Sequence, residues 1–303
     1  MGSTLSNKNI SRTIQDAIVR SVSIALEEDI GDGDLTAQLI PALQTARATI
    51  ISREAAILCG IPWVESCFQQ VALETEIQWR VAEGERIQPN QILCEISGNA
   101  RAMLTAERSA LNFLQTLCAT ATLTRRYVDA IAGTNAQILD TRKTLPGMRL
   151  AQKYAVALGG GMNQRLGLYD GILIKENHIA AAGSIEAALK AAHAIGAGKL
   201  GQRVSIQIEV ETLSQLQTAL EAGATLILLD NFSLQGIREA VSLNAGRAIL
   251  EASGNINLDN VRDVALTGVD RISIGSLTKN VQAVDLSMRF AAMHFEKSSQ
   301  ASI

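Results

Sequence analysis

Paired cysteines, long apolar runs and an excess of basic charge are all missing from this sequence of 303 residues. Its cysteines are widely spaced, without a Cys-x-x-Cys pair, and are Cys59, Cys67, Cys94 and Cys118. We expect them to be buried and reduced, as in a cytoplasmic protein. No apolar run reaches the length of a membrane span and no secretory signal is visible, so we expect no membrane partner. The net charge of −3 gives no field that would attract nucleic acid.

Histidine is also scarce, with three residues that lie far apart along the chain. A zinc site needs clustered histidine or cysteine ligands, so zinc chemistry is not expected. No Ser-His-Asp or Cys-His grouping stands out, which argues against hydrolysis through a covalent nucleophile. Any chemistry of this chain must therefore depend on other side chains.

The first half of the chain combines helices with a layer of strands. Apolar residues recur at helical spacing over residues 10–28 and 105–131. Residues 46–58 and 76–98 favour strands joined by glycine and proline turns. The later of these two segments resembles the hairpin of biotinyl and lipoyl carriers, but it contains no lysine, which a carrier needs at the hairpin tip. We therefore expect a structural β-layer.

Short β-rich runs alternate with amphipathic helices throughout the second half. The six runs are AQILD, GILIK, SIQIEV, TLILLD, AILEAS and RISIGS. The helices are expected near residues 147–159, 183–195, 212–222, 233–244 and 257–267. Three of them have N-cap residues, namely Ser184, Thr212 and Ser233. Alternating βα units form parallel sheets, and six strands are fewer than the eight of a closed barrel. We therefore predict an α/β protein with an incomplete parallel (β/α) barrel, and an open doubly wound sheet is the alternative.

Polar side chains gather at the carboxyl ends of these strands, which form the active face in (β/α) barrels. They comprise cations, carboxylates and Gly/Ser pairs, namely Arg142, Lys143, Lys175, Glu209, Asp230, Ser253-Gly254 and Gly275-Ser276. The two carboxylates either bind Mg²⁺ together with substrate phosphate or neutralise the lysines, and their spacing leaves both interpretations open. The whole set predicts a polyanionic, phosphorylated substrate.

Two other features of this region are interpreted without a chemical role. Arg149 and Lys153 are four residues apart on a helix, which favours a solvated charged face. The glycines at 159–161 favour a flexible loop, but no Gly-Lys-Ser/Thr follows, so this is not a Walker motif.

The order of the motifs resembles that of one known family. The runs TRKTLPGMR, KYAV, GGG, LIKENH, IEVE, LLDNF, SGN and ISIGSLTK are similar to those of quinolinate phosphoribosyltransferases, also called carboxylating nicotinate-nucleotide pyrophosphorylases. The resemblance implies an N-terminal α/β sandwich domain followed by an incomplete barrel. It also implies a homodimer in which the N-terminal region of one subunit caps the site of the other. We expect domains at residues 1–128 and 129–286, with a C-terminal helix at 287–303 that joins the first domain.

The resemblance implies roles for individual residues. The quinolinate carboxylates would be bound by Arg142, Lys143, Arg165 and Lys175, with Arg108 reaching in from the partner subunit. The ribose hydroxyls and Mg²⁺-pyrophosphate would be held by Glu209 and Asp230. The 5′-phosphate would be bound by Ser253, Gly254, Gly275 and Lys279. The expected catalytic residues are Lys143, Glu209 and Asp230, and further substrate contacts are expected from Gln164 and His178. The family often has histidine where this chain has Gln164, which can donate a hydrogen bond but cannot carry charge.

The implied reaction transfers phosphoribosyl from phosphoribosyl pyrophosphate to quinolinate with decarboxylation. It would give nicotinate mononucleotide, pyrophosphate and CO₂ in de novo NAD biosynthesis, with Mg²⁺ as cofactor. Two alternatives are a paralogous barrel enzyme that acts on another anion and a non-catalytic barrel that binds a sugar phosphate. The set of five cations favours a dicarboxylate substrate, and the paired carboxylates argue against a pure anion binder, which would gain nothing from them.

Overall fold

The computed structural model describes residues 11–198 and 204–291, which fall into two compact units. The first unit comprises residues 1–119 together with 282–303, and the second comprises residues 120–281. The division lies within helix α3 (Ala100–Ala130), earlier than the expected boundary after residue 128. Every helix in the described part of the chain is too short or too polar to cross a membrane.

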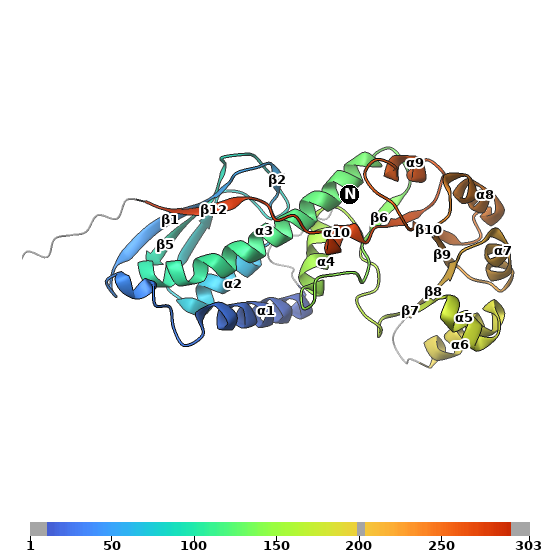
Figure 1. The fold of residues 1–303 in the computed structure, drawn as a ribbon, viewed down its shortest axis with the longest axis horizontal. Coiled ribbons are helices and arrows are strands. Elements are labelled where there is room, and N and C mark those ends of the chain that lie inside the picture. Colours follow the sequence, from blue (N-terminus) through green and yellow to red (C-terminus); the bar gives the residue numbers. More distant parts are fainter. Residues whose placement is uncertain (1–10, 199–203, 292–303) are drawn as a thin grey trace, which may run out of the picture. The chain divides into compact units, whose positions relative to one another are not determined.

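The first unit contains an antiparallel sheet of four strands in the order β12-β1-β5-β3. Its strands are β1 (Thr45–Ser52), β3 (Glu76–Trp79), β5 (Ile92–Asn99) and β12 (Leu286–Phe290). A separate pair is formed by β2 (Ala56–Ile57) and β4 (Arg86–Ile87). The helical elements of this unit are α1 (Arg12–Ile30), the short η2 (Ala37–Leu39), α2 (Ile61–Val71) and the first part of α3. Figure 1 shows α1, α2 and α3 gathered beside the sheet, which explains why alternate residues of β1 are buried.

The C-terminal segment differs from the expected helix. Residues 286–290 form strand β12, which pairs antiparallel with β1, and Ile50 lies opposite Met288. An unpaired strand edge leaves backbone N–H and C=O groups free, and a short extended segment satisfies them. Residues 292–303 of the predicted helix lie outside the described residues.

The second unit is built on six parallel strands in the order β6-β11-β10-β9-β8-β7. They are β6 (Gln137–Leu139), β7 (Gly171–Ile174), β8 (Ser205–Val210), β9 (Leu226–Asp230), β10 (Ile249–Ser253) and β11 (Arg271–Ser273). The outer strands β6 and β7 do not pair with each other, so the sheet stays open. This confirms the predicted α/β fold with an incomplete barrel.

Helices cover the outer side of this curved sheet, as Figure 1 shows. They are α6 (Ile185–Ala197), α7 (Leu213–Glu221), α8 (Leu234–Asn244) and α9 (Val261–Ala265). The predicted N-caps Ser184, Thr212 and Ser233 are confirmed, since each accepts a hydrogen bond from the backbone N–H three residues later. Ile208 and Ile227 are completely buried in the core between sheet and helices. This rigid layer holds all six carboxyl strand ends at one edge.

Candidate active site

A cavity of about 560 Å³ opens at the carboxyl ends of the parallel strands, within the second unit. Most of the predicted site residues line it, namely Arg142, Lys143, Gln164, Arg165, Lys175, Glu209, Asp230, Ser253, Gly254, Gly275 and Lys279. Residues from distant segments meet there because parallel strands place their carboxyl ends at the same edge of the sheet.

The cationic side chains of this cavity are only partly neutralised. Arg165 donates from Nη1 to the carbonyl oxygen of Gly171 at 2.9 Å. Burial and the nearby positive charge of Arg142 lower the pKa of Arg165. Nε of Arg142 is buried and has no hydrogen-bond partner among residues 11–198 and 204–291. A covered guanidinium N–H without an acceptor costs free energy, so the region suits a bound anion.

Three carboxylates line the same cavity from neighbouring strands, and the two that were predicted are Glu209 and Asp230. Glu209 is nearly buried and forms an ion pair with Lys175, with Oε2 and Nζ 2.9 Å apart. Asp230 accepts a hydrogen bond from Nδ2 of Asn231 at 2.7 Å and forms no ion pair with another described residue. The ion-pair interpretation therefore holds for Glu209, whereas Asp230 keeps acceptor capacity for a ligand.

Two glycines bring backbone close to the cavity. Gly254 has a φ of +97°, and an added Cβ would lie 2.1 Å from Oδ1 of Asn231. A Cβ on Gly275 would lie 3.0 Å from Cδ of Lys143. Glycine is required at 254 by the left-handed backbone and the close approach, and at 275 it leaves space for the lysine stem. Exposed backbone N–H groups in such loops are suited to phosphate recognition.

Lys153 is buried, so the interpretation of a solvated face is wrong. The residue is 1% exposed, and its Nζ lies 2.5 Å from Oδ1 of Asp140 and 2.8 Å from the carbonyl oxygen of Gln164. Burial raises the pKa of Asp140, and the attraction of Lys153 opposes that rise. Arg149 is half-buried and donates to backbone oxygens. The buried pair ties helix α4 (Arg149–Leu158) to the end of β6 and supports the segment that carries Gln164 and Arg165.

The glycines at 159–161 pack against α3, which corrects the prediction of a flexible loop. A Cβ on Gly159 would lie 2.6 Å from the carbonyl oxygen of Ala121 and 2.6 Å from Cβ of Thr124. None of the three glycines lines the cavity. They are therefore required for close packing of backbone on a helix.

Replacing Gly159 by alanine should lower the free energy of unfolding by about 1–3 kcal/mol, because the added methyl overlaps the backbone of α3. Urea unfolding followed by far-UV circular dichroism measures this change. Gly198→Ala is a matched control, because its nearest atoms would lie 3.6 Å away and its φ is −75°. Equal losses of stability in both variants would contradict the packing role of Gly159.

Arg108 and His178 do not line this cavity. Arg108 is exposed on the part of α3 that belongs to the first unit. Nδ1 of His178 accepts a hydrogen bond from the backbone N–H of Lys175 at 3.0 Å and so caps helix α5 (Glu176–Ala182). The capping function explains why a histidine stands directly after Lys175, and its contact with substrate stays a prediction.

Several polar residues of the cavity were not predicted. They are Asn231, Glu251, Asn255 and Ser273. A signal was present for Glu251, because a charged residue inside the apolar run AILEAS has to be partnered when the strand is buried. No comparable signal marks the asparagines, which are also common in turns.

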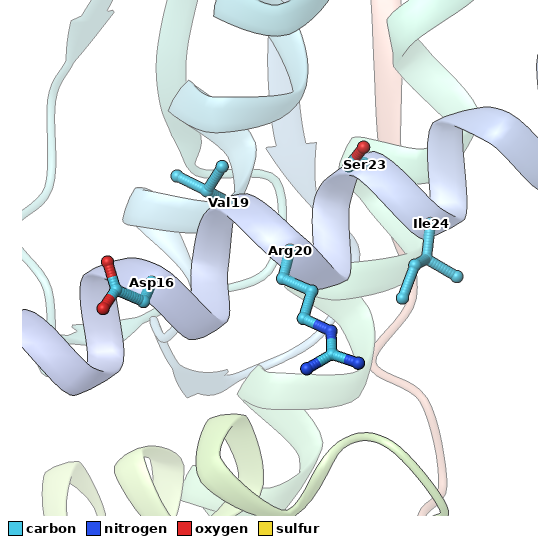
Figure 2. A pocket seen from close by; sticks show the side chains of 5 residues that line it. All are labelled: Asp16, Val19, Arg20, Ser23 and Ile24. Atoms are coloured by element: carbon cyan, nitrogen blue, oxygen red, sulfur yellow. The ribbon is translucent and has the colours of Figure 1, made fainter.

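A second hollow lies along helix α1 in the first unit, as Figure 2 shows. Its lining side chains all belong to that one helix and are Asp16, Val19, Arg20, Ser23 and Ile24. They point in different directions and do not converge on a common centre. This hollow therefore lacks the convergent polar groups of a binding site.

Comparison with known proteins gives a consistent result for both units. The models of the quinolinate phosphoribosyl transferase N-terminal and C-terminal domains match residues 34–118 and 120–289. A probable nicotinate-nucleotide pyrophosphorylase [carboxylating] of Bacillus subtilis is 41% identical over 86% of this chain and 89% of its own. The corresponding protein of Mycobacterium leprae is 39% identical over 90% of this chain and 97% of its own.

A solved structure supports the same assignment. The nicotinate-nucleotide pyrophosphorylase from Francisella tularensis is 42% identical, with a TM-score of 0.87, over 95% of this chain and 100% of that chain. Sequence models, relatives and structure thus agree over nearly the whole length. This chain belongs to the quinolinate phosphoribosyltransferase family.

Proposed function

We propose that this enzyme transfers the phosphoribosyl group of phosphoribosyl pyrophosphate to quinolinate and removes the 2-carboxylate as CO₂. The product is nicotinate mononucleotide, an intermediate of NAD biosynthesis. The observation that carries this proposal is the convergence of five cations with the carboxylates of Glu209 and Asp230 on one cavity of a member of this family.

Quinolinate needs two neighbouring anion sites because it carries two adjacent carboxylates. Arg142 and Arg165 supply planar guanidinium groups that can bind carboxylates through two hydrogen bonds each. Lys143 and Lys175 add point charges on the same cavity, although the charge of Lys175 is shared with Glu209. A monocarboxylate would leave part of this positive charge unpaired, which favours the dicarboxylate.

The other side of the reaction is a phosphorylated sugar. The backbone at Ser253, Gly254 and Gly275, with the ammonium of Lys279, suits its 5′-phosphate. Asp230 and Glu209 can accept hydrogen bonds from the ribose hydroxyls. Asn231 holds the carboxylate of Asp230 from one side, so that the remaining oxygen positions stay open to ligand.

The donor set also suits magnesium brought in by pyrophosphate. No group of three His, Cys, Asp or Glu side chains in the described chain is arranged to hold a metal alone. Mg²⁺ is commonly bound by one or two carboxylates together with substrate phosphate and water, so Asp230 and the ion-paired Glu209 fit it. When bound, the metal neutralises charge on the departing pyrophosphate.

The chemistry requires orientation and electrostatic stabilisation. The ring nitrogen of quinolinate forms a bond to C1′ of the sugar while the bond from C1′ to pyrophosphate breaks, and pyrophosphate keeps that electron pair. Lys143 stabilises the negative charge that develops on the leaving group, and the carboxylates offset positive charge on the ribose. The bond from C2 to its carboxylate then breaks, its electrons remain on C2 beside the cationic nitrogen, and a proton from solvent replaces CO₂.

A turnover assay tests this proposal directly. Quinolinate, phosphoribosyl pyrophosphate and Mg²⁺ are supplied, and nicotinate mononucleotide and CO₂ are followed, with nicotinic acid as a parallel substrate. Product from quinolinate and none from nicotinic acid is the expected result. No product from quinolinate, with turnover of another anion, would transfer the function to a paralogous reaction.

We also propose a homodimer in which Arg108 completes the site of its partner. Arg108 is exposed in the first unit, so it is available to another subunit. The cytoplasm is the proposed compartment because all four cysteines are buried and unpaired.

The shared site can be tested by subunit complementation. Arg108→Ala and Lys143→Ala enzymes should each have little activity, because each loses one charge at every site. A mixed dimer has one site with both defects and one without any, so a random mixture should recover about a quarter of normal activity. Arg20→Ala, at an exposed arginine of the first unit, is the matched control and should be active by itself. Failure of subunits shown to have exchanged to regain activity would contradict the shared site.

A further inference from the structure

A buried polar cluster lies at the cavity and has no part in the mechanism above. Its centre is Glu251 on β10, a cavity residue that is completely buried. Nε2 of Gln164 lies 2.6 Å from both carboxyl oxygens of Glu251. Nε2 of Gln207 on β8 donates to Oε2 of Glu251 at 3.0 Å. Two strands, β8 and β10, and the segment between α4 and β7 are thus connected through one carboxyl group.

The partners of Glu251 are neutral. No ion pair involving Glu251 occurs in the described parts of the chain, and its in-register neighbour on β11 is Arg271, which forms none with it. Burial raises the pKa of Glu251, and the hydrogen bonds and the positive charge of Arg271 oppose that rise only in part. The contacts of Glu251 are therefore hydrogen bonds to neutral amides, and these support a role through hydrogen bonding.

Gln164 is held by its backbone as well as by its side chain. Its N–H donates to Oδ1 of Asp140 at 2.8 Å, and its carbonyl oxygen accepts from Nζ of Lys153 at 2.8 Å. Only the side-chain torsions of Gln164 then remain free, and the bonds to Glu251 fix them. The residue that follows is Arg165, whose guanidinium lines the same cavity.

We propose that Glu251 is a positioning residue for the acidic substrate, which fixes the carboxamide of Gln164 at the cavity wall through hydrogen bonds rather than through charge. This inference rests on the proposed function. A loose Gln164 side chain would occupy several rotamers, and ordering it on binding lowers affinity. Holding Gln164 in place affects the binding of quinolinate. It does not involve the loops at Ser253-Gly254 and Gly275, which are proposed to bind phosphoribosyl pyrophosphate.

Two substitutions of Glu251 separate hydrogen bonding from packing. Glu251→Met keeps the side-chain length and removes the acceptors, and we expect the KM for quinolinate to rise about tenfold with little change in kcat. Glu251→Gln keeps an acceptor oxygen for Nε2 of Gln164, and its new N–H can donate to Oε1 of Gln207 once the amide of Gln207, which donates to Glu251 in this structure, has turned over. We therefore expect a KM within about threefold of the original. The KM for phosphoribosyl pyrophosphate should not change in either variant. The exposed Glu239→Met on α8 is the matched control.

A double-mutant cycle decides whether Glu251 acts through Gln164. In a Gln164→Met background, Glu251→Met should raise the KM no further, because the group it positions is already absent. Additive effects, or a Glu251→Gln enzyme as impaired as Glu251→Met, would overturn the proposal. Thermal unfolding of each variant identifies losses that come from folding, and Glu251→Gln keeps the test valid if Glu251→Met is unstable. If the unmodified enzyme makes no product from quinolinate, the proposed function fails; if it does and the cycle is additive, only this inference fails.

Discussion

Replacing Lys143 by alanine should slow the formation of nicotinate mononucleotide by about 10²–10⁴-fold, because one preorganised cation facing developing charge contributes on that order. The backbone of Lys143 is fixed on both sides. Its N–H donates to Oγ1 of Thr141 at 3.0 Å, and its carbonyl oxygen accepts from Oγ1 of Thr278 at 2.8 Å. Its stem lies close to Gly275. The backbone that carries this cavity side chain is therefore anchored, and the absence of a Cβ at Gly275 leaves room for the stem.

The fall in rate of the Lys143→Ala enzyme should appear mainly in kcat if Lys143 acts on the leaving pyrophosphate. Interactions that form only in the transition state lower kcat and kcat/KM together, whereas lost ground-state binding raises KM. Steady-state rates with each substrate varied in turn separate the two cases. Lys190→Ala, at an exposed position on α6, is the matched control and should leave the rates unchanged. Normal turnover by Lys143→Ala would remove Lys143 from the mechanism.

The strand-end residues could be predicted because two local patterns coincide in them. A short apolar run identifies a buried parallel strand, and the polar residue that ends the run must lie at the carboxyl edge. Lys175, Glu209 and Asp230 follow this rule, and the structure brings all three to one cavity. The rule needs no knowledge of which strands are neighbours, since all carboxyl ends share the same edge.

The contacts of residues within a helix or loop were harder to predict, because their partners come from other segments of the chain. Arg149 and Lys153 are four residues apart, which predicts that they share one face of a helix. The spacing does not predict what that face contacts. The partner of Lys153 is Asp140, which lies thirteen positions away and directly after β6. The glycines at 159–161 likewise read as a loop until their contact with α3 is seen. The C-terminal strand was missed because it completes a sheet whose other strands lie far earlier in the chain.

Removing the charge of Lys153 should destabilise the protein more than the Gly159→Ala substitution does. Lys153→Met keeps the length of the side chain but leaves Asp140 buried without its counter-charge, and breaking a buried pair in this way costs about 3–5 kcal/mol. Of its side-chain contacts with residues 11–198 and 204–291, Asp140 would keep the hydrogen bonds from the side chain of Asn163 and the backbone of Gln164. Since Lys153 also holds the carbonyl oxygen of Gln164, the cavity wall should loosen in any molecules that remain folded.

The double variant Asp140→Asn/Lys153→Met distinguishes an uncompensated charge from lost packing. It removes both charges and keeps a side-chain oxygen at 140 for the backbone N–H of Gln164, so it should be more stable than Lys153→Met alone. Urea unfolding should be followed by far-UV circular dichroism, because the only two tryptophans, Trp63 and Trp79, lie in the other unit. Lys190→Met, at an exposed site, controls for the change of side chain. If the double variant were no more stable than the single one, the loss would come from packing, and the buried charge of Asp140 would not be what makes Lys153 necessary.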